Sequence, residues 1–110
     1  MRSIAARSLA AGGSLVLEAN FHCGESEPWL RELAAGADTR VVICRTAAEE
    51  NRRRYSSRPR RHPVHRDAEI LATEWPPDSE FEIELGVPSL VVDTTDGYEP
   101  DLAAIVRFIA

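Results

Sequence analysis

The sequence of 110 residues contains no lysine, and all 13 of its basic residues are arginine. Its six glycines are scattered, so no glycine-rich loop ends in Lys-Ser or Lys-Thr. In enzymes that carry such a loop, its backbone amides and its lysine hold the phosphates of a nucleotide. The two absences exclude a complete phosphate-loop (P-loop) enzyme within these residues and any site that depends on a lysine.

Long apolar runs and cysteines are also scarce. No apolar run approaches the roughly 20 residues that cross a bilayer, and Arg7 interrupts the Ala/Leu-rich start, which argues against a secretory signal. Of the two cysteines, Cys44 lies in an apolar run and Cys23 in an expected loop, with no spacing typical of a metal site. We therefore expect a cytoplasmic protein that binds no membrane, with Cys44 buried and both thiols reduced.

Charge is unevenly distributed along the chain. Residues 52–66, called here the arginine-rich segment, carry seven arginines and no acid, whereas all 18 acids lie elsewhere and the formal net charge is −5. An acidic chain with one cationic segment indicates a local anion site and is not typical of a general nucleic-acid coat. We therefore expect no nucleic-acid partner, and an arginine-rich nucleic-acid-binding module remains an alternative.

Alternating helix and strand patterns predict an α/β fold in a single domain, residues 1–110. Gly12 is placed to end the first helix, Thr46 to cap the third and Pro59 to stop it. Continuous apolar strands indicate burial on both faces, and hence a parallel sheet of about three strands in a three-layer αβα sandwich. The expected helices are 2–11, 28–35, 47–58, 67–74 and 100–109, and the expected strands are 14–19, 39–45 and 87–94.

Polar residues follow each expected strand, and active groups of parallel sheets gather at the carboxyl ends of the strands. Glu18 could act as a general base or hold Mg²⁺ through water, or could merely end its strand. Asp93, followed by Thr94 and Thr95, could line a pocket for a nucleotide base or merely start the turn to the last helix. We expect the carboxyl ends, residues 18–21, 45–46 and 93–96, to meet at one edge of the sheet.

The arginine-rich segment is the main candidate for chemistry. Arg54 and Arg58 are four residues apart on one helix face, and Arg61 follows in a loop. Guanidinium groups bind phosphate oxygens bidentately, so several could stabilise a transferring phosphoryl group. The alternative is a solvated cationic face that pairs with acids elsewhere. His62 and His65 fit contact with substrate or with the arginines better than a zinc site, which needs more ligands.

Four motifs, taken in order, resemble a known family. They are Gly12-Gly13-Ser14-Leu15-Val16-Leu17-Glu18-Ala19-Asn20-Phe21, Arg54-x-x-x-Arg58, Arg61-His62-Pro63-x-His65-x-Asp67 and Val91-Val92-Asp93-Thr94-Thr95. Their order and spacing are similar to the carboxyl-terminal portion of small bacterial P-loop kinases of the AAA ATPase type, such as chloramphenicol phosphotransferase, zeta toxin and polynucleotide kinase domains. The resemblance covers roughly residues 4–109.

The resemblance implies an ATP-dependent phosphotransferase that uses ATP and Mg²⁺ and acts on a small molecule or a nucleotide. It implies that residues 47–74 form a lid over ATP and that Glu18 lies beside the magnesium and the substrate. From the residues themselves we expect no metal ligand among the side chains of this chain. The expected catalytic residues are Glu18, Arg54 and Arg58; the cofactor-binding residues are Arg54, Arg58, Arg61, Asp93, Thr94 and Thr95; and the substrate-binding residues are Asn20, His22, His62 and His65.

The sequence departs from the family pattern in one respect. The family's first strand, phosphate loop, first helix and second strand would all precede residue 1, and that first strand normally lies between the strands that match 14–18 and 39–45. We therefore expect a partial P-loop domain that is inactive as this chain alone. The alternative is a non-catalytic, truncated relative that binds a partner or forms a homo-oligomer to complete its sheet.

Overall fold

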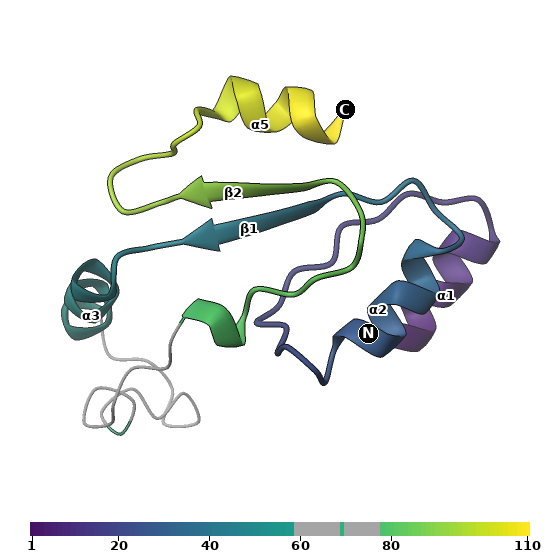
Figure 1. Ribbon diagram of the computed structural model, residues 1–110, viewed down its shortest axis with the longest axis horizontal. Helices are drawn as coiled ribbons and strands as arrows, with labels where there is room; N and C mark the ends of the chain where they lie inside the picture. The colour runs from purple at the N-terminus through teal and green to yellow at the C-terminus, as the bar shows by residue number, and fades with distance from the viewer. Residues whose placement is uncertain (59–68, 70–77) are drawn as a thin grey trace. The chain divides into compact units, whose positions relative to one another are not determined.

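The computed structural model describes residues 1–58, 69 and 78–110. These residues have a mixed α/β structure with a small parallel sheet, in which β1 and β2 run in the same direction (Figure 1). The elements are α1 (Arg2–Ala10), α2 (Glu27–Ala34), β1 (Val41–Arg45), α3 (Ala48–Ser57), the 3₁₀ turn η2 (Asp78–Glu80), β2 (Ser89–Asp93) and α5 (Leu102–Ile109). The loop predicted at 59–66 lies outside the described residues, as does the helix predicted at 67–74 apart from Glu69.

The chain divides into two compact units. The first unit contains residues 1–41 and 78–90, and the second contains residues 42–77 and 91–110. In the first unit α1 packs against α2, and the buried apolar side chains are Ala5 of α1, Leu30 of α2 and Ile83. In the second unit the buried side chain is Val92 of β2, which is almost completely enclosed.

The carboxylate of Glu27, at the start of α2, connects two backbone segments of the first unit. Glu27 accepts hydrogen bonds from the backbone N–H groups of Gly24 and Glu84, each 2.7 Å long. The bond from Glu84, and then that from Gly24, holds the pKa of Glu27 below its usual value, because both bonds favour the charged carboxylate. Arg31 adds a bond from its guanidinium to the carbonyl oxygen of Glu84 at 2.5 Å. These contacts tie α2 to a segment more than 50 residues later.

The ends of the helices follow from local sequence. α1 ends at Ala10, and Gly12 then adopts a φ of +76°, a left-handed conformation that favours glycine, as predicted. α3 ends at Ser57, and Arg58 is extended with a ψ of 140°, because a residue that precedes proline is restricted to that region. The predictions of α1, α2, α3, α5, β1 and β2 are confirmed, with ends that differ by at most two residues.

The predicted strand at 14–19 is wrong, because these residues form no regular structure. A strand exists only where a neighbouring strand accepts its backbone hydrogen bonds, and no described strand pairs with this segment. The side chain of Val16 is consequently 93% exposed. The sheet in the described part of the chain has two strands, and not the expected number of about three.

Burial of the strands on both faces is also contradicted. Burial alternates along β1, where Val41 and Ile43 are half-buried while Val42 and Cys44 are exposed. Such alternation is typical of a sheet with one covered face. The prediction that Cys44 is a buried thiol is therefore wrong, because an even-numbered position in this strand points away from the covered face.

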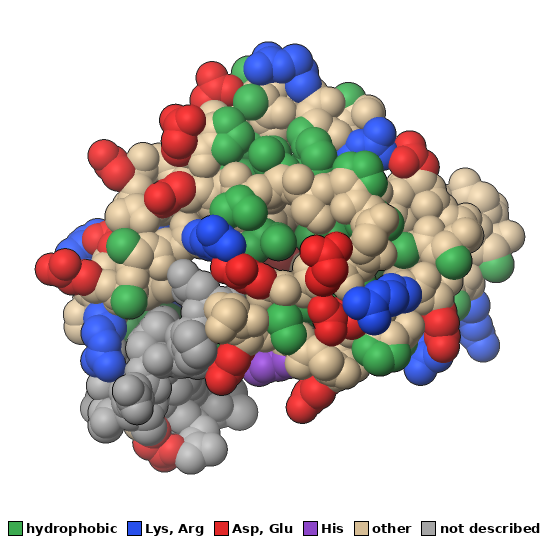
Figure 2. All heavy atoms as spheres, viewed as in Figure 1, with side chains coloured by type: hydrophobic (Ala, Val, Ile, Leu, Met, Phe, Trp, Pro, Cys, Tyr) green, Lys and Arg blue, Asp and Glu red, His purple; other side chains and the backbone are tan. Residues whose placement is uncertain are grey.

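Charges of both signs share the molecular surface. Figure 2 shows acidic side chains spread over the described part of the viewed face, with arginine side chains between them, so these described residues form no continuous cationic surface in this view. Among the described helices, none has the length and apolarity that a membrane span requires.

Candidate functional site

The carboxyl ends of β1 and β2 meet within the second unit, as predicted for residues 45–46 and 93–96. The backbone N–H of Thr94 donates to the carbonyl oxygen of Arg45 at 2.7 Å. The hydroxyl groups of Thr46 and Thr94 lie 2.6 Å apart, and the hydroxyl of Thr95 accepts the N–H of Ala47 at 2.9 Å. The residues that follow the two strands therefore form one polar cluster at the start of α3.

The prediction that Thr46 caps α3 is wrong. The N-cap residue is Ala47, whose methyl side chain cannot accept a hydrogen bond from the first turn of the helix. Because the hydroxyl of Thr46 has a partner on the neighbouring strand, in Thr94, it does not turn toward the helix. Glu49 and Glu50 lie in the first turn of α3, where a negative charge is favoured by the helix dipole.

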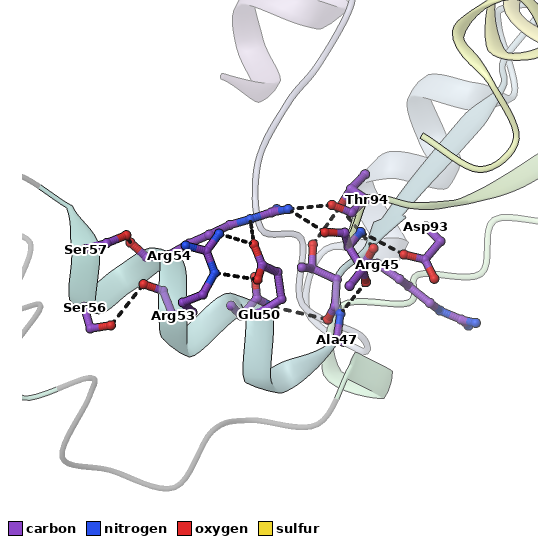
Figure 3. A network of polar contacts seen from close by, with 12 residues as sticks. Arg45, Ala47, Glu50, Arg53, Arg54, Ser56, Ser57, Asp93 and Thr94 are labelled. Carbon is purple, nitrogen blue, oxygen red and sulfur yellow. Dashed lines mark hydrogen bonds and ion pairs between the residues drawn. The ribbon is translucent and has the colours of Figure 1, made fainter. Parts of the chain in front are cut away.

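Arg54 connects α3 to the loop after β2. Its Nη2 donates to the carbonyl oxygen of Thr94 at 2.8 Å and to that of Thr95 at 3.0 Å. Its Nε donates to Glu50 at 2.8 Å. Figure 3 shows the Arg54 side chain extended from the helix toward Thr94. Arg54 thus lies in the site that the sequence predicted. Its three hydrogen bonds, to Glu50 and to the carbonyl groups of Thr94 and Thr95, are made within the protein and not to a ligand.

Glu50 and Arg53, which the sequence analysis did not select, complete this arrangement. The Nε and Nη2 of Arg53 each donate to one carboxylate oxygen of Glu50 at 2.7 Å. The Arg53 bond, and then the Arg54 bond, lowers the pKa of Glu50 to about 2. The same pairing raises the pKa of Arg53. Spacings of three and four residues between an acid and an arginine on a helix are the signal that could have identified the pair.

Arg58 is placed differently from Arg54. Its guanidinium carbon lies 4.2 Å from the centroid of the Tyr55 ring, a cation–π contact. Within the described part of the chain, Arg58 makes no ion pair, and its side chain is exposed. A guanidinium that stacks on a ring keeps the N–H groups at its edge available for an oxyanion.

Asp93 stabilises the loop after β2. Its carboxylate accepts the backbone N–H of Thr95 at 2.8 Å, and this bond lowers the pKa of Asp93. The backbone of Asp93 also pairs with that of Glu99, which closes the turn that contains Gly97. Asp93 therefore has the turn role that the sequence analysis kept as an alternative to a base pocket.

The other predicted residues lie elsewhere. Glu18, Asn20 and His22 belong to the first unit, where all three are exposed. The ring of His22 packs against that of Phe81, with centroids 5.0 Å apart. Arg61, His62 and His65 lie outside the described residues.

While Glu50 is bonded to both arginines, the described residues of this site do not by themselves fit the phosphates and magnesium ion of ATP. The Nε of Arg54 and the fork of Arg53 are engaged by Glu50, and the Asp93 carboxylate is engaged by Thr95. In the described ranges there is no group of three or more His, Cys, Asp or Glu side chains placed to hold a metal. A shallow, open depression of about 310 Å³ does adjoin the cluster, lined by Ala47, Glu49, Glu50, Arg53 and Thr95.

The fold and site together define an α/β protein with a polar, arginine-containing cluster at the carboxyl ends of two parallel strands. Comparison of this chain with models of protein families, with curated proteins and with solved structures found no significant match. The resemblance to P-loop kinases therefore remains a prediction from the four motifs.

The low pKa of Glu50 predicts a specific dependence of stability on pH. A carboxylate whose pKa falls from its usual 4.5 to about 2 on folding contributes stability in full above pH 4.5 and loses it as pH falls through about 2. We expect Glu50→Gln to unfold at a lower temperature than the wild type at pH 6, and this difference to disappear largely by pH 2. Thermal unfolding followed by circular dichroism between pH 2 and 6 measures it. A difference that stays constant with pH would contradict the pairing.

Proposed function

We propose that this chain is part of a P-loop kinase-like phosphotransferase domain and supplies the loop after the last strand and an arginine-bearing lid helix. The observation that carries the proposal is the meeting of the Arg45–Thr46 and Asp93–Thr95 ends beside α3. In open α/β sheets, ligands bind at the carboxyl ends of the strands, and α3 with its arginines begins directly after the carboxyl end of β1. The order of the four motifs supports the same function.

In this proposal the two arginines have separate roles. Arg58, whose exposed guanidinium stacks on Tyr55 and forms no ion pair in the described part, contacts phosphate oxygens together with Arg61. Arg54 is a positioning residue that acts through the carbonyl groups of Thr94 and Thr95. The resemblance assigns Glu18 to catalysis and assigns contact with the phosphate acceptor to Asn20, His22, His62 and His65. The complete domain is a three-layer αβα sandwich in the cytoplasm, where ATP is available.

ATP and Mg²⁺ are not held by this chain alone in the proposed function. The 110 residues contain neither the lysine nor the glycine-rich loop that would bind the phosphates. The chemistry that ATP–Mg²⁺ supplies is transfer of its terminal phosphoryl group. The residues of this chain then orient the nucleotide and neutralise negative charge, and they do not provide the phosphate loop.

A second candidate is a non-catalytic relative that acts by self-association. It is favoured by the apolar side chains of Leu102, Val106 and Ile109, which lie on one face of α5 and are all more than half exposed. Contiguous exposed apolar side chains are typical of surfaces that another protein covers. A second copy of the chain is the occupant that this candidate requires.

Calorimetric titration with ATP–Mg²⁺ tests the proposal on this chain and on a version extended by the upstream reading frame. We expect no measurable binding by this chain and clear binding by the extended version. In the extended version, Arg58→Ala should weaken binding by about tenfold or more, the loss of one charge-assisted hydrogen bond. Ser56→Ala, on the same helix, is the matched control and should bind as the unsubstituted version does.

The kinase proposal fails if the extended version does not bind ATP–Mg²⁺. Light scattering after gel filtration of the same samples gives the oligomeric state, which tests the second candidate, self-association. A well-folded monomer at all concentrations would contradict self-association, whereas a dimer without ATP binding would favour it.

A further inference from the structure

Three N–H donors converge on one carboxylate at the start of α3. The donors are the Nε and Nη2 of Arg53 and the Nε of Arg54, and they bond the two oxygens of Glu50 over 2.7 to 2.8 Å. Figure 3 shows the Glu50 carboxylate between the two guanidinium groups. A planar fork of N–H donors together with a third donor is also the arrangement that binds a phosphate group.

Arg54 is held in place independently of Glu50. The two bonds from its Nη2 to the carbonyl groups of Thr94 and Thr95 would persist if the carboxylate of Glu50 were absent. Its Nε would therefore stay directed at the same point. A preorganised donor loses little freedom when it binds a ligand, which distinguishes this arrangement from an ordinary pair of charges on a helix surface.

The cluster is also accessible from solvent. The open depression of about 310 Å³ has Glu50, Arg53 and Thr95 among its lining residues. The side chain of Arg53 is 66% exposed and that of Glu50 is 19% exposed, so the carboxylate is covered in part by a partner that itself lies largely in solvent. A small anion can reach the donors without a change in β1 or β2.

We propose that Arg53 and Arg54 form a binding site for a phosphate group, and that Glu50 occupies this site as an internal competitor in the absence of ligand. The site rests on the side chains of α3 and does not depend on the kinase-like function. A phosphate dianion has more charge and one more acceptor oxygen than the carboxylate, so it competes for the same donors. Glu49, which also lines the depression, adds repulsion that keeps affinity in the wild type low.

Removal of the competitor tests the site. We expect Glu50→Gln to bind inorganic phosphate at least about tenfold more tightly than the wild type, because the donors of both arginines are released from a charged partner. Calorimetric titration at constant ionic strength measures the affinity. The double variant Glu50→Gln with Arg53→Gln should lose the gain.

Glu49→Gln is the matched control. It removes the same charge from the same depression, but Glu49 does not bond either arginine in the structure. Equal gains in phosphate affinity for Glu49→Gln and Glu50→Gln would overturn the proposal, because they would show a general electrostatic effect. The absence of any gain for Glu50→Gln would also overturn it.

ATP without magnesium is titrated into Glu50→Gln in parallel. If the affinity for ATP rises more than the affinity for inorganic phosphate, the terminal phosphate of a nucleotide is the ligand. If the two affinities rise equally, free phosphate is the ligand.

If Glu50→Gln does not fold, the site can still be tested by nuclear magnetic resonance on the wild type. The ¹H–¹⁵N signals of the Nε groups of Arg53 and Arg54 are recorded during addition of phosphate and, separately, of chloride at the same ionic strength. We expect shifts with phosphate alone, as Glu50 is displaced. Identical spectra in the two salts would overturn the site.

Discussion

Replacement of Arg54 by glutamine is expected to lower the free energy of unfolding by about 1.5–3 kcal/mol, the range for hydrogen bonds that involve a charged group. Glutamine is too short to reach both carbonyl groups, so Thr94 and Thr95 lose their shared donor. The side chain of Arg54 is 39% exposed, and water therefore replaces part of the loss. Urea unfolding followed by circular dichroism measures the effect.

Two further variants separate geometry from charge. Arg53→Gln removes the neighbouring arginine, whose side chain is 66% exposed, and should cost clearly less stability than Arg54→Gln, because an exposed ion pair contributes little. Arg54→Lys keeps the charge but loses the planar fork, and should recover little of the stability lost in Arg54→Gln. Equal costs for Arg53→Gln and Arg54→Gln would contradict the assignment of Arg54 as the connection between α3 and the loop after β2.

Replacement of Leu30 by alanine should lower the free energy of unfolding by about 2–5 kcal/mol, because it leaves a cavity among buried apolar side chains. Leu30 is the buried residue of α2 and is 7% exposed. The free energy of unfolding of a domain is usually about 5–15 kcal/mol, so this one change removes a large part of it. The urea midpoint at neutral pH gives the loss.

The matched control is the same substitution on the exposed face of α5. Leu102 is 60% exposed, so Leu102→Ala should change the free energy of unfolding by no more than about 0.5 kcal/mol. A loss from Leu102→Ala as large as that from Leu30→Ala would contradict its exposure and would indicate that another copy of the chain covers α5 in solution.

The elements that were predicted well depend on neighbours in sequence. Gly12 ends α1 through its own φ, and Arg58 is extended because Pro59 follows it. The convergence of Arg45 with Thr94 was also predictable, since the carboxyl ends of parallel strands lie on one edge. These inferences need only local propensities and one rule of sheet topology.

The errors and omissions involve contacts between distant residues. The run at 14–19 has the composition of a strand, but no described strand pairs with it. Cys44 has the surroundings of a buried residue in sequence, but burial alternates along β1 among the described residues, and Cys44 lies at an exposed position. Glu50 was not selected as a site residue, although its spacing to Arg53 and Arg54 could have identified their bonds.

The sequence by itself determined the absence of a lysine-dependent phosphate loop, the cationic character of residues 52–66, and the order of the described helices and strands. Composition, charge and local backbone preference are properties of short segments, which explains this success. Only the tertiary structure decided that Arg54 bonds the carbonyl groups of Thr94 and Thr95, 40 and 41 residues away in the chain. Backbone carbonyl groups are present at every residue, so no sequence pattern distinguishes the two that lie within reach of this guanidinium.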